Sequence, residues 1–229
     1  LYKLTPTLSV YGNYSEDSPP CPYQAVQRMK KSTSSGADKA NEFGLKKDFK
    51  DWVTTLSFFH IKQPTGITNT DNCYVLDGET ETAGGRNISG KVSSNLTLTG
   101  GLMLLDAKYK RTQNGANDGH RVHGTPKLNA TLALDWDTPV KGLSINGRVV
   151  HFGKSYADTG NKVNVSSWTR FDLGATYDTE LAKISTTFSF NAYNLFDRKY
   201  WSTATTVWAD GMVMLNPGRT YILSATMHF

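Results

Sequence analysis

The chain has 229 residues, of which 38% are apolar, and a formal net charge of +5 at neutral pH. This length fits one large all-β unit or two small domains. It contains no apolar run of about 18 residues, which excludes an ordinary transmembrane helix, and its dispersed positive charge argues against a nucleic-acid partner.

Apolar residues recur at every second position in about ten segments, the period of a β-strand with two different faces. In 128–136, for example, Leu128, Leu132 and Trp136 alternate with Asn129 and Asp135. Several segments approach the roughly 9–11 residues that a tilted strand needs to cross a bilayer. In chain order the predicted strands are 2–16, 40–49, 52–62, 86–94, 97–109, 128–136, 143–155, 167–179, 183–196 and 221–229.

The connections between these segments alternate between long and short. The long ones are roughly 17–40, 63–85, 110–125, 156–166 and 198–216, and a short helix is expected at 22–31 in the first of them. The short ones are 50–51, 94–95, 138–142 and 179–182. Such an alternation is typical of an outer-membrane barrel, which has long extracellular loops and short periplasmic turns.

The sequence therefore predicts an all-β fold, an antiparallel transmembrane β-barrel with a polar lumen face and an apolar lipid face. A soluble β-sandwich also alternates and is the alternative fold. Aromatic residues near the predicted strand ends favour the barrel, because they would form interfacial girdles; they are Trp52, Tyr109, Trp136, Trp168, Tyr177, Tyr200 and Phe229.

The C-terminal segments resemble the signature of TonB-dependent siderophore receptors. They are "NAYNLFDRKYW" (191–201) and "NPGRTYILSATMHF" (216–229), and "NEFGLKKDF" (41–49) and "GHRVHGTPKLNATLALDW" (119–136) are similar to earlier family segments in the right order. The hydroxamate branch, of ferrichrome or ferrioxamine type, is the most similar.

The resemblance implies a barrel of about 22 strands with a plugged lumen. Residues 1–229 would then be the C-terminal part of that barrel, and the plug, the TonB box and the early strands would lie outside this chain. The chain starts at Leu1 without a basic-then-apolar leader, so we expect a removed signal peptide or a longer parent protein.

The resemblance also implies a function: binding of a ferric siderophore at the outer face of a Gram-negative outer membrane, and import driven by the TonB–ExbB–ExbD complex. The protein would not be an enzyme and would need no cofactor, since iron is carried by the ligand. Further implied partners are outer-membrane lipid, lipopolysaccharide, and a phage or bacteriocin. The barrel-assembly machinery is another implied partner, and it would recognise Tyr221 and the terminal Phe229.

Bulky chelates suit aromatic and apolar loop side chains. The candidate ligand-binding residues are Tyr200, Trp201, Trp208, Met214, Tyr156 and Tyr23. Arg111, Arg121 and Arg198 could attract an anionic ligand.

Other polar pairs have simpler interpretations. Arg170 with Asp172, and Glu42 with Lys46, would be lumen-wall ion pairs, because a charge on the lipid face costs about 2–4 kcal/mol at the midplane. The histidines of "HRVH", His120 and His123, lie in a loop without an obvious third ligand, so no metal site is predicted.

Cys21 and Cys73 fall in neighbouring long loops, where a disulfide could join them, or either could pair with a cysteine outside the chain.

The alternative function is a self-contained ten-stranded outer-membrane barrel. It would act either as a protease with catalytic groups at the rim, for which Asp118, His120 and His123 are the candidates, or as a passive pore or adhesin.

Overall fold

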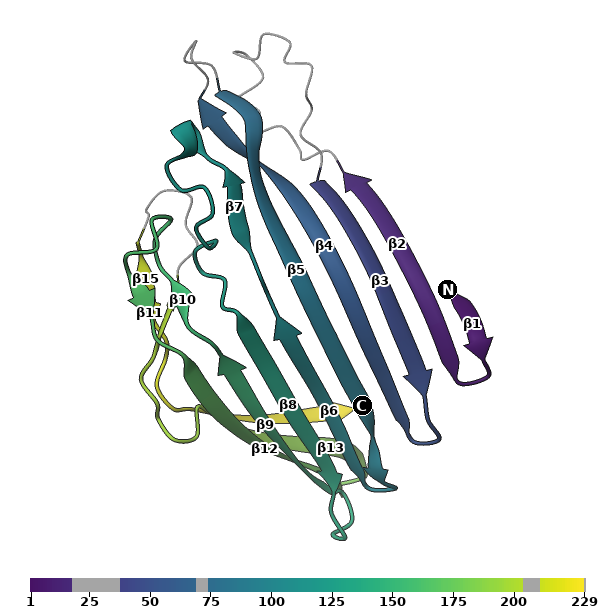
Figure 1. Cartoon of the computed structure of the whole chain (residues 1–229). Helices are drawn as coiled ribbons and strands as arrows, with labels where there is room; N and C mark the ends of the chain where they lie inside the picture. The colour runs from purple at the N-terminus through teal and green to yellow at the C-terminus, as the bar shows by residue number, and fades with distance from the viewer. Residues whose placement is uncertain (18–37, 69–73, 204–210, 229) are drawn as a thin grey trace.

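The computed structural model describes residues 1–17, 38–68, 74–203 and 211–228. Its main element is a 12-stranded antiparallel sheet, ordered β1-β2-β3-β4-β5-β6-β8-β9-β12-β13-β16, with β7 also paired to β5. Figure 1 shows that the sheet is curved, so that β12 and β13 turn away from the plane of β2–β5. Its strands are β1 (Tyr2–Thr5), β2 (Leu8–Asp17), β3 (Asp38–Asp48), β4 (Trp52–Thr68), β5 (Tyr74–Ser93), β6 (Leu96–Leu104), β7 (Lys108–Arg111), β8 (Leu128–Asp137), β9 (Leu143–Phe152), β12 (Trp168–Leu181), β13 (Ile184–Tyr193) and β16 (Thr220–His228).

Four shorter strands lie in the long connections. β10 (Ser155–Tyr156) pairs with β11 (Asn164–Val165), and β14 (Trp201–Thr203) pairs with β15 (Val213–Leu215). A 3-10 helix, η1 (Gln113–Gly115), is the only helix in the described ranges. Across those ranges, no helix has the length and apolar character to cross a membrane.

The predicted short turns and three of the five predicted long connections are confirmed, whereas the long connection at 17–40 falls mostly outside the described residues and 63–85 is mostly strand. The short turns 49–51, 94–95, 138–142 and 182–183 all lie at one end of the sheet, here called the turn end. The connections 105–127 and 153–167, and the described parts of 194–219, lie at the opposite loop end (Figure 1). The predicted helix at 22–31 falls outside the described residues.

The two faces of the sheet differ as the alternation predicts. On the outer face, Leu173 of β12 lies beside Ala192 of β13 and Gly147 of β9, and large apolar side chains such as Leu132 and Leu223 are 48% and 77% exposed. The inner face carries polar residues, since the register places Gly174 between Asn146 and Asn191 and Asp172 beside Arg148.

Four predicted boundaries were wrong. Segment 2–16 is two strands, because a turn at Pro6 and Thr7 separates β1 from β2. Most of 63–85 is not a loop, since Gln63–Thr68 and Tyr74–Gly84 extend the β4–β5 ladder.

The other two errors concern β6 and the last short turn. Segment 97–109 is interrupted after Leu104, and β7 continues along the longer β5. The turn at 179–182 moves to Ala182 and Lys183, both at positive φ (49° and 67°), which is the two-residue hairpin type that matches strand twist.

Charged residues replace apolar ones on the outer face of β4 toward the loop end. Phe58 is followed at alternate positions by His60 and Lys62, which contact Glu81 and Glu79 of β5. Lys110 of β7 adds a 2.7 Å ion pair to Glu81. Because charges on a lipid face are costly, this change marks where the wall leaves the apolar layer.

A close contact on the inner face requires a glycine in β3. The ring of Tyr11 in β2 lies over Gly44, and a Cβ at Gly44 would be 2.2 Å from that ring. The Tyr11 hydroxyl donates to Glu42 Oε1 at 2.8 Å. Glu42 therefore pairs with Tyr11, and the predicted Glu42–Lys46 ion pair is wrong, because Lys46 contacts Asp48 at 3.6 Å instead.

Replacing this glycine should weaken the wall. In the intact receptor, Gly44→Ala should displace the Tyr11 ring and lower the free energy of unfolding by about 1–3 kcal/mol, a typical cost of overpacking. Thermal unfolding in detergent measures the change. Gly12→Ala is the matched control, because its Cβ would meet only an ordinary 3.8 Å contact. Equal melting temperatures for the two variants would contradict the role assigned to Gly44.

Candidate functional site

Three aromatic rings stack at the loop end of the inner face. Phe152 ends β9 and Trp168 begins β12, and the antiparallel register places them side by side with ring centroids 4.7 Å apart. Tyr200, from the connection 194–219, also stacks on the Trp168 ring, with centroids 4.2 Å apart. These three residues are called the aromatic stack. Rigid stacked rings of this kind suit the binding of a bulky ligand by shape and dispersion.

Two arginines share one carboxylate beside the aromatic stack. Arg148 of β9 donates from Nε and Nη2 to Asp172 Oδ2, at 3.1 and 2.8 Å. Arg170 of β12 donates from Nη2 to the same oxygen at 3.1 Å, and its Nε lies 3.0 Å from Asp172 Oδ1. Arg170 Nη1 also reaches the Tyr200 hydroxyl at 3.5 Å. The predicted Arg170–Asp172 pair is therefore confirmed, and Arg148 and Arg170 are called the arginine pair.

Gly174, two positions after Asp172 in β12, leaves space on the inner face for two amide side chains. A Cβ at this position would lie 2.6 Å from the side-chain oxygens of both Asn146 and Asn191. These amides come from the strands on either side of β12. Only a glycine lets both amides approach the centre strand.

The motif "NLFDR" closes the base of the last connection. Asn194 Nδ2 donates to the carbonyl oxygens of Arg198 and Pro217 at 2.9 and 3.3 Å, and its Oδ1 accepts from Arg198 N at 2.9 Å. Asp197 Oδ1 accepts from Arg219 N at 2.8 Å. Asn194 and Asp197 thus join the first and last residues of the 194–219 connection, and they are called the loop clamp.

Asp172 links the loop clamp to the arginine pair. Its Oδ1 accepts a hydrogen bond from the backbone N–H of Asn194 at 2.9 Å, and its side chain is only 8% exposed. Leu195 N also donates to Phe171 O at 2.7 Å. The connection that carries Tyr200 is therefore anchored to β12, which carries Trp168 and Arg170.

The connections 105–127 and 153–167 bind each other through backbone and side-chain amide groups. Arg121 N donates to Asn161 Oδ1 at 2.8 Å, and Asn161 Nδ2 donates to Arg121 O at 2.9 Å. Gly124 N donates to Tyr156 O, also at 2.8 Å. Apart from Ala192, the most buried apolar side chains of the described residues lie in or beside the long connections: Ala107, Tyr109, Ala157, Val165 and Tyr200.

Asp158 organises the turn of the 153–167 connection. Its side-chain oxygens accept hydrogen bonds from Lys162 N and Val163 N at 3.0 and 2.7 Å. Burial disfavours the charged carboxylate, but these backbone hydrogen bonds outweigh burial, so the pKa of Asp158 lies below its usual range.

The structure brings some of the predicted ligand residues together. Tyr200 is buried in the aromatic stack, whereas Trp201 and Met214, in the paired strands β14 and β15, are 53% and 59% exposed. Tyr156 is half-buried in β10, and the neighbouring Ala157 O accepts from Gly211 N at 3.2 Å, which joins its connection to the last one. Tyr23, Trp208, Cys21, Cys73 and Phe229 fall outside the described residues.

Several other predicted roles change. Tyr200 and Trp168 belong to the inner face and Tyr109 packs under the 105–127 connection, so none of the three is a girdle residue. Tyr221 does lie on the outer face, 58% exposed and stacked on Phe190.

The charged loop residues also have partners. Arg121 pairs with Asp106 at 3.1 Å, and Arg111 lies 3.7 Å from Glu79. His120 contacts Thr159 O, while His123 contacts the Tyr109 hydroxyl.

Sequence reasoning missed Phe152, Arg148 and Asn194 as site residues. The period of two puts Trp168, Arg170 and Asp172 on one face, which is a readable signal. It does not say that Phe152 and Arg148 of another strand are their neighbours, because the register between strands is a tertiary property.

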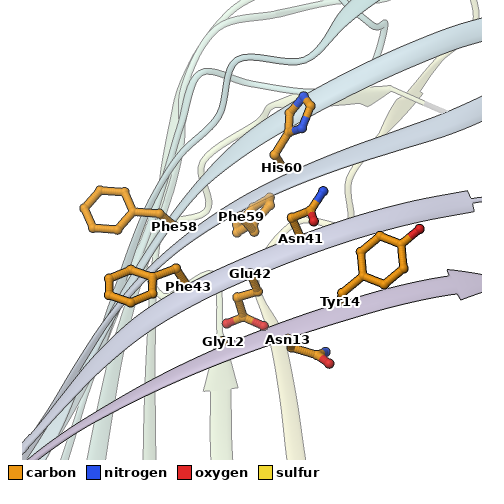
Figure 2. A pocket seen from close by; sticks show the side chains of 9 residues that line it. All are labelled: Gly12, Asn13, Tyr14, Asn41, Glu42, Phe43, Phe58, Phe59 and His60. Carbon is orange, nitrogen blue, oxygen red and sulfur yellow. The ribbon is translucent and has the colours of Figure 1, made fainter.

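A second, open hollow lies over β2, β3 and β4. Figure 2 shows Phe43 and Phe58 side by side there, as their cross-strand pairing requires, and the lining also includes Tyr14, Glu42 and His60. The register places Glu42 on the inner face and the other four on the outer face. Beyond Val10, β2 has no second neighbouring strand among the described residues, so both faces are accessible at this edge. We therefore do not treat this hollow as a ligand site.

Comparisons with known proteins agree with the fold. The family model described as TonB dependent receptor-like, beta-barrel matches residues 1–195. The ferrichrome receptor FcuA of Yersinia enterocolitica is 30% identical over 86% of this chain and 27% of its own length. The ferrichrome outer membrane transporter/phage receptor of Escherichia coli K12 is 26% identical over 82% of this chain and 28% of its own. The crystal structure of BauA, the ferric preacinetobactin receptor of Acinetobacter baumannii, superposes with a TM-score of 0.83 at 31% identity, covering 98% of this chain and 35% of that one.

The chain belongs to the TonB-dependent receptor β-barrel family. The predicted family, the transmembrane β-barrel fold and the location in the Gram-negative outer membrane are thereby confirmed. The members matched here are transport receptors and not enzymes. The chain spans between 27% and 33% of the length of the curated relatives.

Removing the loop clamp should loosen the last connection. Asn194 has a positive φ of 53°, so Asn194→Gly keeps the backbone conformation and removes only the side-chain hydrogen bonds. We expect the free energy of local opening of 194–219 to fall by about 2 kcal/mol, because the three side-chain hydrogen bonds of Asn194 are lost. Hydrogen exchange of the intact receptor measures this, with Asn164→Gly, at an exposed position in β11, as the control. Unchanged exchange in 194–219 would contradict the clamp.

The lowered pKa of Asp158 predicts an acid-sensitive connection. The folded-state pKa lies below the unfolded value, so the stabilisation is complete above about pH 4 and is lost as the pH falls through the folded-state pKa. Pepsin cleavage within 153–167 should therefore accelerate at the acid end of a pH 5 to pH 2 series. In Asp158→Asn, which cannot titrate, this acceleration should shrink; identical pH profiles would show that Asp158 has no such role.

Proposed function

We propose that the protein containing this chain imports a ferric siderophore across the outer membrane. The observation that supports this proposal best is the aromatic stack beside the arginine pair, at the loop end of the inner face of a TonB-dependent receptor barrel. Ferric siderophores are bulky chelates, which bind by shape and dispersion to rigid rings and by a few directed polar groups. Iron is the cargo within the ligand, so the proposal requires no resident cofactor.

Import in this proposal is binding followed by movement, without any bond being broken. The chelate would enter from the loop end and rest on the aromatic stack. The loop clamp and Asp172 hold Tyr200 beside Trp168, so the surface is organised before the ligand arrives. The TonB–ExbB–ExbD complex would then act on a plug domain supplied by another part of the polypeptide.

We further propose that residues 1–229 form the C-terminal wall of a larger barrel. One edge of the sheet is formed by β1 and by the part of β2 beyond Val10, and the other edge is β16. Leu223, on the outer face of β16, is 77% exposed. Unpaired backbone groups in lipid cost several kcal/mol each, so both edges need further strands. Those strands would also cover the hollow over β2.

Other partners follow from the same proposal. The apolar outer face would contact lipid, and the charged outer surface of β4, β5 and β7 would meet lipopolysaccharide headgroups. The barrel-assembly machinery would read the C-terminal strand that contains Tyr221 and Phe229. The relative in Escherichia coli is named as a phage receptor, and the long connections of this chain are proposed as a surface for phage or bacteriocin.

The hydroxamate type of ligand stays a prediction. Its support is that two relatives are named for ferrichrome, which is a hydroxamate chelate. A rim protease or a passive pore, the alternative functions considered from the sequence, has no support from the matched relatives, which are receptors.

The test is growth on chelated iron. A strain lacking its own siderophore receptors should grow under iron limitation when it carries the full-length gene and receives a ferric siderophore. It should not grow when TonB is deleted. A variant lacking two rings of the aromatic stack, Phe152→Ala with Trp168→Ala, should bind the siderophore at least about tenfold more weakly, since each ring that the ligand covers contributes about 1 kcal/mol or more. Growth that does not need TonB would contradict import and favour a pore.

A further inference from the structure

We infer that the arginine pair selects ferric chelates that carry net negative charge on carboxylate or catecholate oxygens. This inference rests on the proposed import of a ferric siderophore. It narrows the substrate class to anionic chelates, in place of the neutral hydroxamate type that the names of two relatives favour. It concerns the sign of the ligand's charge, which neither the fold nor the aromatic stack determines.

The first argument is the charge balance on the inner face. Arg148 and Arg170 face one carboxylate, Asp172, so this part of the wall has a formal surplus of one positive charge. On β9, β12 and β13 the neighbouring positions of the same face are uncharged: Val150, Gly174, Asn146 and Asn191. Asp135 of β8 also lies on this face, opposite Asn146 and two residues along from the partner of Arg148. Within the described parts of the chain, no second carboxylate pairs with either arginine.

The second argument is that Asp172 is already committed. Its Oδ1 holds the Asn194 backbone N–H, and its Oδ2 accepts from both guanidinium groups. The Asp172 side chain is only 8% exposed. It therefore cannot move toward one arginine alone without losing its hydrogen bond to the Asn194 backbone N–H, which holds the loop clamp. The surplus charge is therefore a fixed property of the folded wall.

The third argument is that donors remain free to face a ligand. A guanidinium has five N–H donors, and Arg148 uses only Nε and Nη2 toward Asp172. Its side chain is 43% exposed on the inner face. With these remaining donors, Arg148 can form paired hydrogen bonds to the oxygens of an anionic carboxylate or catecholate chelate. A ferric trihydroxamate, which is neutral overall, attracts the guanidinium less strongly.

The aromatic stack and the arginine pair form one continuous surface. Trp168 and Arg170 occupy alternate positions of β12, and Phe152 and Arg148 share the same face of β9. Tyr200 connects the two groups, because its ring stacks on Trp168 and its hydroxyl lies 3.5 Å from Arg170 Nη1. A chelate resting on the rings would place its charged oxygens within reach of the guanidinium groups.

The test compares ligands of different charge on the purified full-length receptor in detergent. The probes are ferric citrate, a ferric tris-catecholate and neutral ferrichrome, measured by equilibrium binding. Arg148→Gln should weaken binding of an anionic probe by about tenfold or more and leave ferrichrome within about twofold, because only the anionic probe uses the charge. Arg148→Lys should restore most of the anionic binding.

The two anionic probes separate the two oxygen types. A larger loss for ferric citrate identifies carboxylate oxygens, and a larger loss for the tris-catecholate identifies catecholate oxygens. Lys127→Gln removes one exposed loop cation outside the pair and is the matched control for net charge; it should leave all three affinities within about twofold.

Three results would overturn the inference. Equal losses for all probes in Arg148→Gln would show a structural role, and no loss would show that the arginine is not used. A wild-type receptor that binds ferrichrome alone would reject the charge preference while supporting siderophore import. A receptor that binds none of the three probes would count against the proposed function itself.

Discussion

Backbone hydrogen bonding between neighbouring antiparallel strands is the constraint on which the whole structure depends. In lipid, every N–H and C=O of a wall strand must be paired within the sheet, so the chain runs back and forth in register from β1 to β16. That register also decides the chemistry of the two faces, because successive side chains point to opposite sides. Leu173 faces outward with Ala192, and Asp172, one position earlier, faces inward with Arg148.

A few groups connect the inner face, the proposed ligand surface, to the last long connection. Asp172 joins the arginine pair to Asn194, and Asn194 joins the two ends of the connection that carries Tyr200. The ring of Tyr200 then completes the aromatic stack on Trp168. The aromatic stack, the arginine pair and the position of the last connection are therefore set by one contiguous cluster. A ligand that binds the arginines as proposed would act on Asp172, the same carboxylate that holds the connection.

Much of the fold could be predicted from residue patterns. Ten of the strands, the side that carries the long connections and the Arg170–Asp172 pair all follow from a period of two and from the cost of charges in lipid. The errors came where local signals are weak. The polar segment 63–85 lacks apolar alternation, so it was predicted to be a loop. In the structure its two halves pair with each other as the ends of β4 and β5. These ends lie beyond the apolar layer, where a strand needs no apolar face.

The amino-acid sequence by itself determined that this protein is an antiparallel barrel wall with a polar face and an apolar face, because side-chain alternation is a local property of each strand. Only the tertiary structure decided which residues meet across strands: Phe152 with Trp168, Arg148 with Asp172, and Asn194 with Pro217. Register and loop closure bring together groups that lie 16 to 24 positions apart in these pairs, and no pattern within a single strand encodes such distances.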